Sequence, residues 1–146
     1  MCKIMEMKRG EGGFTLIELG IVMALVGIMA LFMAPAIGEW IDNFRIRQAA
    51  RDISSTLQQA KMQAISTKTT NSVDFDTTNN TYTLQPEGKM AQVQRGVNIV
   101  DGSTTATVSF APDGSSSGGT ITIDNAKGKQ YQVNINGVGR VSIQEI

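Results

Sequence analysis

The feature that most constrains this chain is a long apolar segment near its N-terminus, residues 14–41. Its sequence is FTLIELGIVMALVGIMALFMAPAIGEWI, in which Glu18 and Glu39 are the only charged residues. The twenty residues from Leu19 to Gly38 contain no Asp, Glu, Lys or Arg. As an α-helix the segment would be about 42 Å long, which exceeds the roughly 30 Å hydrocarbon core of a bilayer. The segment therefore predicts a single transmembrane helix.

A short hydrophilic segment, residues 1–13, precedes the apolar segment and ends in Gly12 and Gly13. In a general secretory signal peptide the small-residue cleavage site follows the apolar stretch, whereas here the glycines come before it. Cleavage after Gly13 would leave the apolar segment on the mature chain as an anchor, with Phe14 as its first residue. Basic residues flank both ends of that segment. The short leader and the large polar remainder nevertheless favour a cytoplasmic N-terminus.

Glu18 is a carboxylate near the start of the apolar segment, where its presence needs an explanation. At the centre of a membrane helix such a group costs roughly 2.5–3.5 kcal/mol. One interpretation is that Glu18 lies only about 6 Å deep and reaches the headgroups. The other is that it pairs with a cation of another subunit, such as the α-amino group of a neighbour's Phe14, and so sets the register between helices. The residues alone leave both interpretations open.

The helix is predicted to continue beyond the membrane through residues 42–71. Apolar residues recur at spacings of three and four, which indicates an amphipathic helix. This stripe predicts contact with the following domain, with a groove for a partner as the alternative. Helix-breaking residues begin at Thr67, and Trp40 is interpreted as an anchor at the membrane–water boundary. The stripe comprises Ile46, Ala50, Ile53, Leu57, Ala60 and Ala64.

Residues 72–146 show short alternating segments separated by turn-forming residues, which predict β-strands. Asn136 and Gly137 predict a tight turn between the last two strands. Strands of this kind suit an antiparallel sheet with one face packed on a helix. The predicted fold class is therefore α+β, a long N-terminal helix laid against a C-terminal antiparallel β-domain. The predicted strands lie at 72–75, 81–84, 97–100, 105–110, 120–123, 130–135 and 140–143.

Composition argues against an enzyme. The chain has no histidine and a single cysteine, Cys2, which removes the usual nucleophile–histidine pairs and the commonest zinc ligand. Residues 124–128 could form a calcium loop, but they lack the ligand spacing of such loops and a nearby glutamate. A plain turn is the preferred interpretation. We expect no cofactor and no metal.

The sequence GFTLIEL, from Gly13 to Leu19, resembles the class III signal of type IV prepilins and type II secretion pseudopilins. In that family a membrane peptidase cleaves after the glycine and N-methylates the new terminal phenylalanine. The resemblance implies cleavage between Gly13 and Phe14, N-methylation of Phe14, and a role for Glu18 in subunit docking. Pro35 matches a position where the family's helix commonly kinks. The implied partners are prepilin peptidase/N-methyltransferase and other pseudopilins or pilins.

The C-terminal half is similar to the H-type minor pseudopilins and to the related FimT minor pilins, over residues 108–123 and 131–143. The family usually has a second basic residue two positions after the arginine of its glycine-arginine pair. In this chain Gly139 and Arg140 form the pair, and Ser142 stands at that position.

The resemblance implies a minor pseudopilin of the periplasmic pseudopilus of a type II secretion system, stored in the inner membrane with its C-terminal domain in the periplasm. The alternative is a FimT-like minor pilin of a type IV pilus, active in pilus assembly or DNA uptake. DNA binding would need several phosphate contacts. Because Arg140 is the only basic residue among the last fifteen, it is the candidate for a weak DNA contact, and we expect no nucleic-acid partner.

Overall fold

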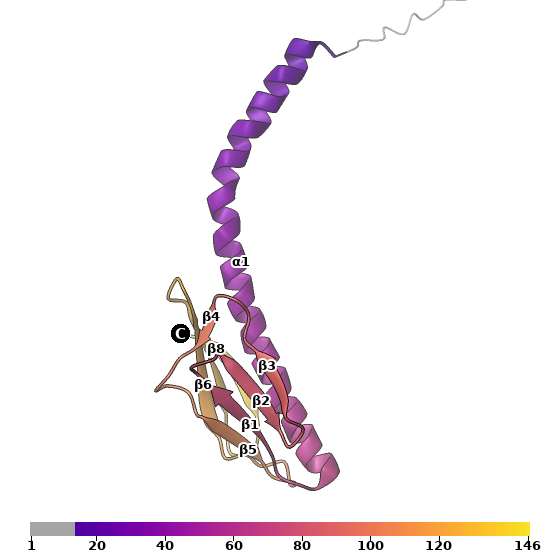
Figure 1. Ribbon diagram of the computed structural model, residues 1–146, viewed down its shortest axis with the longest axis vertical. Helices are drawn as coiled ribbons and strands as arrows, with labels where there is room; N and C mark the ends of the chain where they lie inside the picture. The colour runs from indigo at the N-terminus through magenta and orange to yellow at the C-terminus, as the bar shows by residue number, and fades with distance from the viewer. Residues whose placement is uncertain (1–13) are drawn as a thin grey trace, which may run out of the picture. The chain divides into compact units, whose positions relative to one another are not determined.

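The computed structural model describes residues 14–146, without the side chains of residues 33–37. The chain divides into two compact units, which meet between Gly38 and Glu39, close to the predicted boundary after residue 41. Helix α1 (Leu16–Thr67) contains residues of both units, and eight strands follow it along the chain (Figure 1). The predicted α+β fold class is confirmed.

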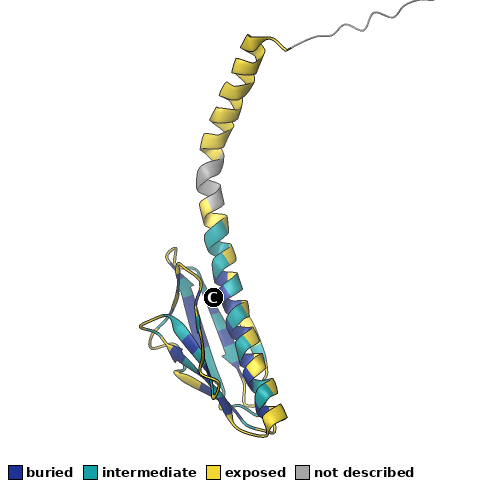
Figure 2. Ribbon diagram, turned by 45° about the vertical axis from the view of Figure 1, so that its right-hand side comes forward, coloured by how far each residue is buried: buried dark blue, intermediate teal, exposed yellow. Residues whose placement is uncertain are grey.

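The second half of α1 packs one face on the strands. Ile46, Leu57 and the alanines at 60 and 64 have no exposed surface, and Ala50 and Ile53 are 1% exposed. All six residues of the predicted stripe therefore belong to the core, along with Ala49 (Figure 2). Each large aliphatic side chain buried in this way contributes about 1.5–3 kcal/mol. Of the two uses considered for the stripe, the structure shows contact with the chain's own sheets.

Helix α1 ends at Thr67, where the predicted helix-breaking residues begin, four residues before the predicted bound at 71. The hydroxyl of Thr67 donates to the carbonyl of Gln63 at 2.8 Å, which competes with continued helical hydrogen bonding. Lys68 follows with a φ of 55°, the left-handed conformation common just after a helix. The chain then enters the first strand at Asn71.

The eight strands form two four-stranded sheets with only antiparallel pairing. The first sheet has the order β3-β2-β1-β5 and the second has the order β4-β6-β7-β8. A single sheet was predicted, so the division into two is a correction. The strands are β1 (Asn71–Asp76), β2 (Thr81–Gln85), β3 (Lys89–Gln92), β4 (Val97–Ile99), β5 (Thr107–Phe110), β6 (Gly119–Asn125), β7 (Gln130–Ile135) and β8 (Val141–Glu145).

Strand β3 was not predicted. Three of its four residues are exposed, so neither face imposes the apolar alternation that marks a half-buried strand. The seven other strands agree with the predicted positions within a few residues at each end. Their inward side chains meet the helix stripe in one core. The largest of these fully buried strand residues are Leu84, Phe110, Ile121 and Ile123, with Val73, Val108 and Val133 beside them.

Candidate functional site

Helix α1 begins with a side-chain cap formed by Thr15. The amide of Glu18 donates to Thr15 Oγ1 at 3.2 Å, and the amide of Leu19 donates to the Thr15 carbonyl at 3.1 Å. Threonine is favoured at this position because its oxygen satisfies an amide that the helix leaves unpaired. The role of Thr15 was missed, although the Thr-x-x-Glu spacing of Thr15 and Glu18 is its sequence signal.

Glu18 lies in the first turn of α1 and is exposed. A carboxylate is favoured there because the unpaired amides give the helix start a partial positive charge. No cation among residues 14–146 lies within ion-pair distance of Glu18. The carboxylate of Glu18 therefore lies in the first turn of a capped helix. There it stabilises the helix start, and it can also form an ion pair with a cation of another molecule.

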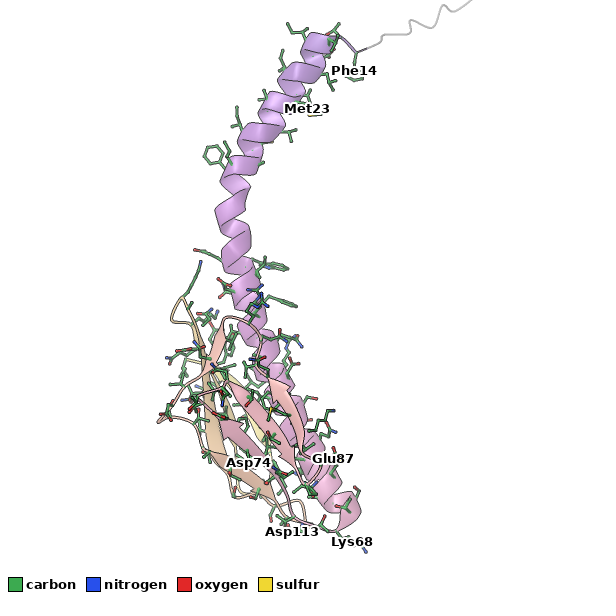
Figure 3. The ribbon with its side chains drawn as sticks, in the orientation of Figure 1. Phe14, Met23, Lys68, Asp74, Glu87 and Asp113 are labelled. Atoms are coloured by element: carbon green, nitrogen blue, oxygen red, sulfur yellow. The ribbon has the colours of Figure 1, made fainter. Side chains whose placement is uncertain are left out.

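The large apolar side chains of residues 14–32 are all exposed (Figure 2). Among the large ones in residues 14–32, the exposed fraction ranges from 47% at Val22 to 89% at Leu16. Met23 shows how these side chains project from the helix, and Phe14 lies just before the helix begins (Figure 3). Contiguous apolar surface of this kind marks a site of protein or membrane contact.

Within the described part of the chain, no helix reaches the combination of length and apolarity that a membrane crossing requires. The predicted transmembrane span of residues 14–41 is thus not confirmed and stays a prediction. Gly13, at the predicted cleavage site, lies outside the described residues. Pro35 lies within the bounds of α1, but its side chain is among those not described, so its predicted kink also stays a prediction.

At the start of the second unit two aromatic side chains form an exposed pair on α1. The rings of Trp40 and Phe44 stack with centroids 5.8 Å apart, and they are 68% and 55% exposed. Nearby, the carboxylate of Glu39 pairs with Lys127 at 3.5 Å. The aromatic pair leaves an apolar surface at this point of the helix, which is compatible with the anchor role predicted for Trp40.

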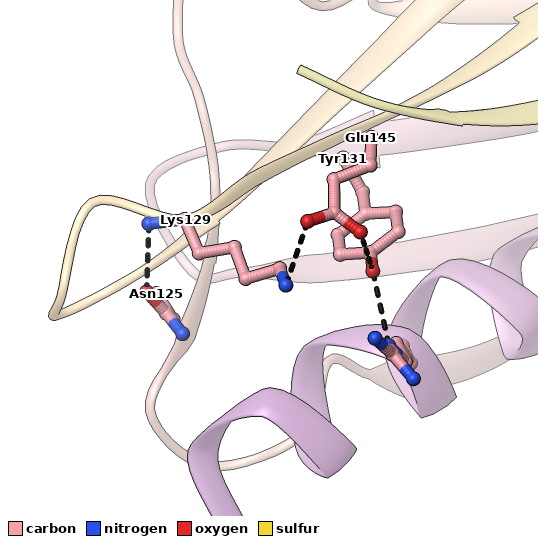
Figure 4. A network of polar contacts seen from close by, with 5 residues as sticks. Asn125, Lys129, Tyr131 and Glu145 are labelled. Atoms are coloured by element: carbon pink, nitrogen blue, oxygen red, sulfur yellow. Dashed lines mark hydrogen bonds and ion pairs between the residues drawn. The ribbon is translucent and has the colours of Figure 1, made fainter. Parts of the chain in front are cut away.

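A polar network joins α1 to strands β7 and β8 (Figure 4). Arg47 Nε donates to the Tyr131 hydroxyl at 3.1 Å, and that hydroxyl donates to the Glu145 carboxylate at 2.5 Å. Lys129 Nζ pairs with the other Glu145 oxygen at 2.7 Å. The hydrogen bonds from Lys129 and Tyr131 lower the pKa of Glu145. The hydrogen bond and attraction to Tyr131 raise the pKa of Arg47.

A second polar contact joins α1 to the turn between β7 and β8. Lys61 Nζ donates to the carbonyls of Val138 and Gly139, each at 3.1 Å. Gly139 has a φ of 68°, and a Cβ there would lie 2.5 Å from the Gly114 carbonyl oxygen. Only glycine fits this position, because both the backbone conformation and the close approach exclude a side chain. The glycine of the glycine-arginine pair therefore has a structural role.

Arg140 is exposed and lines a groove of about 250 Å³. Its amide donates to Asn136 Oδ1 at 2.8 Å, which holds the turn. The other residues lining the groove are uncharged, namely Gly119, Thr120, Asn134, Ile135, Asn136 and Ser142. The geometry thus offers one cationic side chain to an anion at this place.

Residues 124–128, considered as a calcium loop, comprise the end of β6 and the start of the turn that leads to β7. Asn125 Oδ1 accepts hydrogen bonds from the amides of Lys127 and Lys129 at 3.1 and 3.0 Å. The side chain of Asn125 therefore closes the turn on itself. Among the residues that the structure describes, no three His, Cys, Asp or Glu side chains gather as metal ligands would.

Comparison with known families gives two matches. Residues 49–139 match the family described as type II transport protein GspH. Residues 8–34 match the prokaryotic N-terminal methylation motif, which contains Gly13, Phe14 and Glu18. Among curated proteins no match was found.

Two solved structures share the fold at low sequence identity. The minor pilin FimU of Pseudomonas aeruginosa is 16% identical, with a TM-score of 0.58 over 72% of this chain and 92% of FimU. The minor pseudopilin EpsH of the Vibrio cholerae type 2 secretion system is 13% identical, with a TM-score of 0.57 over 69% of this chain and 97% of EpsH.

A methylation motif on a long N-terminal helix that continues into a small antiparallel β-domain defines the pilin-like class of proteins. Within that class the β-domain decides the family, since the match from residue 49 to residue 139 covers most of the chain. The chain belongs to the GspH family of type II transport proteins, the minor pseudopilins of type II secretion.

Proposed function

We propose that this minor pseudopilin is stored in the inner membrane and assembles into the periplasmic filament of a type II secretion system, with Glu18 as the docking carboxylate. The observation that carries the proposal is the coexistence of two surfaces on one chain. The strands bury the apolar stripe in the second half of α1, whereas residues 14–32 leave every large apolar side chain exposed. That exposed surface has to be covered by lipid or by the helices of other subunits.

Transfer from membrane to filament requires that neighbouring helices replace the lipid contacts of residues 14–32. Apolar contacts alone discriminate poorly between lipid and another apolar helix. A charge pair makes the association specific, because it forms only when one subunit meets another in the correct axial register. Glu18 is suited to this pair, since it is exposed on a capped helix and no described cation holds it.

The proposed cation is the α-amino group at Phe14 of the neighbouring subunit. Processing after Gly13 would create it, and an α-amino group with a pKa of about 7.7–8.0 is largely protonated near neutral pH. The membrane peptidase that cleaves and methylates the chain is then a required partner. The match of residues 8–34 to the methylation motif supports this step.

The test replaces Glu18 by glutamine, which removes the charge but retains a side chain that suits the cap at Thr15. We expect filament incorporation to fall about tenfold or more, which corresponds to the loss of roughly 1.4 kcal/mol, at an unchanged level of protein in the membrane. Glu39→Gln is the matched control, because it removes a carboxylate from the same helix at the Lys127 pair. Its incorporation should equal that of the unmodified chain.

Incorporation of Glu18→Gln at the unmodified level would refute the docking role. Mass spectrometry of the mature chain separates this question from processing, since it should find N-methylated Phe14 in all three proteins. A chain that retains residues 1–13 would instead refute the proposed maturation.

A minor pilin of a type IV pilus is the second candidate, favoured by the fold similarity to FimU. DNA uptake by such a protein would depend on Arg140, the single cation lining its groove. A gel-shift of the detergent-solubilised chain with duplex DNA at about 50 mM salt favours few-contact binding. Tight binding that Arg140→Ala abolishes would support this candidate, and no shift would exclude DNA as its partner.

A further inference from the structure

Strand β8 forms an edge of the second sheet and leaves part of its backbone without a partner. The amide of Ile146 donates to Gln130, and that of Asn136 donates to Arg140. With the register of Tyr131 opposite Glu145, the even-numbered residues of β8 therefore bond to β7. The amides of Val141, Ile143 and Glu145 point away from the sheet. Within the described chain none of these three amides has a hydrogen-bond partner.

Two other sheet edges in the described chain are covered by the chain itself. The outward amides of Val97 and Ile99 in β4 donate to Gln94 O at 3.0 Å and to Asn80 Oδ1 at 2.7 Å. On β5, the outward amide and carbonyl of Ser109 bond to the hydroxyl and amide of Ser117 at 3.1 and 2.9 Å. Covered edges of this kind are protected against the addition of a further strand.

Strand β3 is the remaining edge of the first sheet, and it differs from β8 in two respects. It has four residues where β8 has five. It also carries Lys89, and lysine on an edge strand is a common protection against pairing with another chain. The sequence of β8, VSIQE, contains no lysine and no proline, and its register with β7 is regular throughout. Strand β8 is thus the least protected edge.

A groove of about 340 Å³ lies along this edge, between β8 and helix α1. Ile143 supplies an apolar side chain to it that is 41% exposed. Arg47 lines the groove but is held by Tyr131. Arg51 also lines it, is exposed, and has no ion pair or hydrogen bond within the described residues. Glu145 lines the groove as well, with its carboxylate held by Tyr131 and Lys129. The groove therefore combines a free strand edge, an apolar contact, an engaged carboxylate and an unengaged guanidinium.

We propose that β8 binds an extended acidic segment of another protein, which adds a strand to the second sheet and places a carboxylate beside Arg51. The backbone of the added strand satisfies the outward groups of Val141, Ile143 and Glu145, as in other cases of strand addition. Its alternate side chains face the groove, where an apolar residue contacts Ile143. A bidentate pair with Arg51 selects an acidic segment over a neutral or basic one.

The probe is an N-terminally fluorescein-labelled peptide, Val-Thr-Glu-Thr-Val-amide, in which the valines and the glutamate share one face of the strand. The second peptide has lysine in place of glutamate. Fluorescence anisotropy with the full chain in detergent micelles measures both affinities. We expect the glutamate peptide to bind about tenfold more tightly than the lysine peptide, as one charge-assisted pair would give. Arg51→Glu should reverse this preference, while Arg95→Glu, at an exposed arginine outside the groove, should leave it unchanged.

The strand itself is tested by Ile143→Pro, which removes an outward amide that β7 does not use. Proline is tolerated at such edge positions, and circular dichroism checks that the sheet is retained. We expect Ile143→Pro to abolish binding of both peptides, whereas Ile143→Ala, which keeps the amide, should weaken binding less. Absence of binding to the unmodified chain at millimolar peptide would overturn the proposal. Equal affinities for Ile143→Pro and Ile143→Ala would overturn it as well.

Discussion

The two halves of helix α1 differ in the exposure of their apolar side chains. Between Ile46 and Ala64, residues of one stripe are buried by the strands of the same molecule. Between Leu16 and Phe32, large apolar side chains are exposed on every face. The first arrangement is that of an amphipathic helix packed on a sheet, and the second is that of a helix with an exposed apolar surface.

This difference shows that one helix can have two kinds of apolar surface when the spacing of its apolar residues changes along its length. A stripe at spacings of three and four is sufficient for intramolecular packing. A helix that is apolar on every face leaves surface that one small domain does not cover. Substitutions in the two halves should therefore affect different measurements.

The largest effect is expected in the buried half. Leu57 has no exposed surface, and Leu57→Ala should lower the free energy of unfolding by about 2–5 kcal/mol. Urea unfolding followed by circular dichroism measures this change. Leu25→Ala is the matched control, at a side chain that is 57% exposed, and should change the unfolding free energy by less than about 0.5 kcal/mol. Equal losses would remove the distinction between the two halves.

An intermediate effect is expected at the contact between α1 and the β7–β8 turn. Gly139→Ala should cost about 1–3 kcal/mol, because its Cβ would approach the Gly114 carbonyl and the Lys61 ammonium at 2.5 and 3.0 Å. Gly128→Ala controls for backbone strain, since Gly128 has a φ of 78° but no atom within 4 Å of the added Cβ. If both variants lose the same stability in a thermal melt, the close contact has no effect of its own.

The smallest effect is expected from the polar network at Glu145, because exposed ion pairs contribute little. Hydrogen bonds from Lys129 and Tyr131 lower the folded-state pKa of Glu145 below its ordinary value of 4.5. The associated stability is therefore fully present above that value and is lost as the pH falls through the folded-state pKa. The urea midpoint of the wild type should decline more steeply below about pH 5 than that of Glu145→Gln.

Asp76 and Asp113 also have lowered pKa values, through hydrogen bonds from Asn79 and Ser115. Both groups remain in the Glu145→Gln variant, so only the difference between the two curves reports Glu145. Parallel curves would show that the network adds no acid-sensitive stability.

Much of the fold was predicted from the sequence, because elements with one buried face show a regular spacing of apolar residues. The stripe from Ile46 to Ala64 was predicted because one face of the helix is buried, and strand β7 was predicted because its side chains alternate between buried and half-buried. Strand β3 has no such alternation. The division into two sheets could not be read either, because it depends on long-range pairing, such as β1 with β5, that no local pattern encodes.

The candidate site was predicted from the resemblance of one short sequence to the prepilin signal, and it remains to be tested by experiment. Gly13, Phe14 and Glu18 come from the GFTLIEL sequence, and the structure adds the cap at Thr15. The structural need for Gly139 was not predicted, since it arises from the approach of Gly114, a residue distant in the sequence. The free edge of β8 was also not predicted, because it depends on which strands lie beside it.

The stacked pair of Trp40 and Phe44 has a practical consequence. Trp40 is the only tryptophan of the chain, and it is mostly exposed. Its fluorescence therefore reports the surroundings of the helix at this one point and is insensitive to melting of the hydrophobic core. The protein carries a built-in optical reporter whose emission should shift toward the blue when lipid or a neighbouring subunit excludes water from the indole ring.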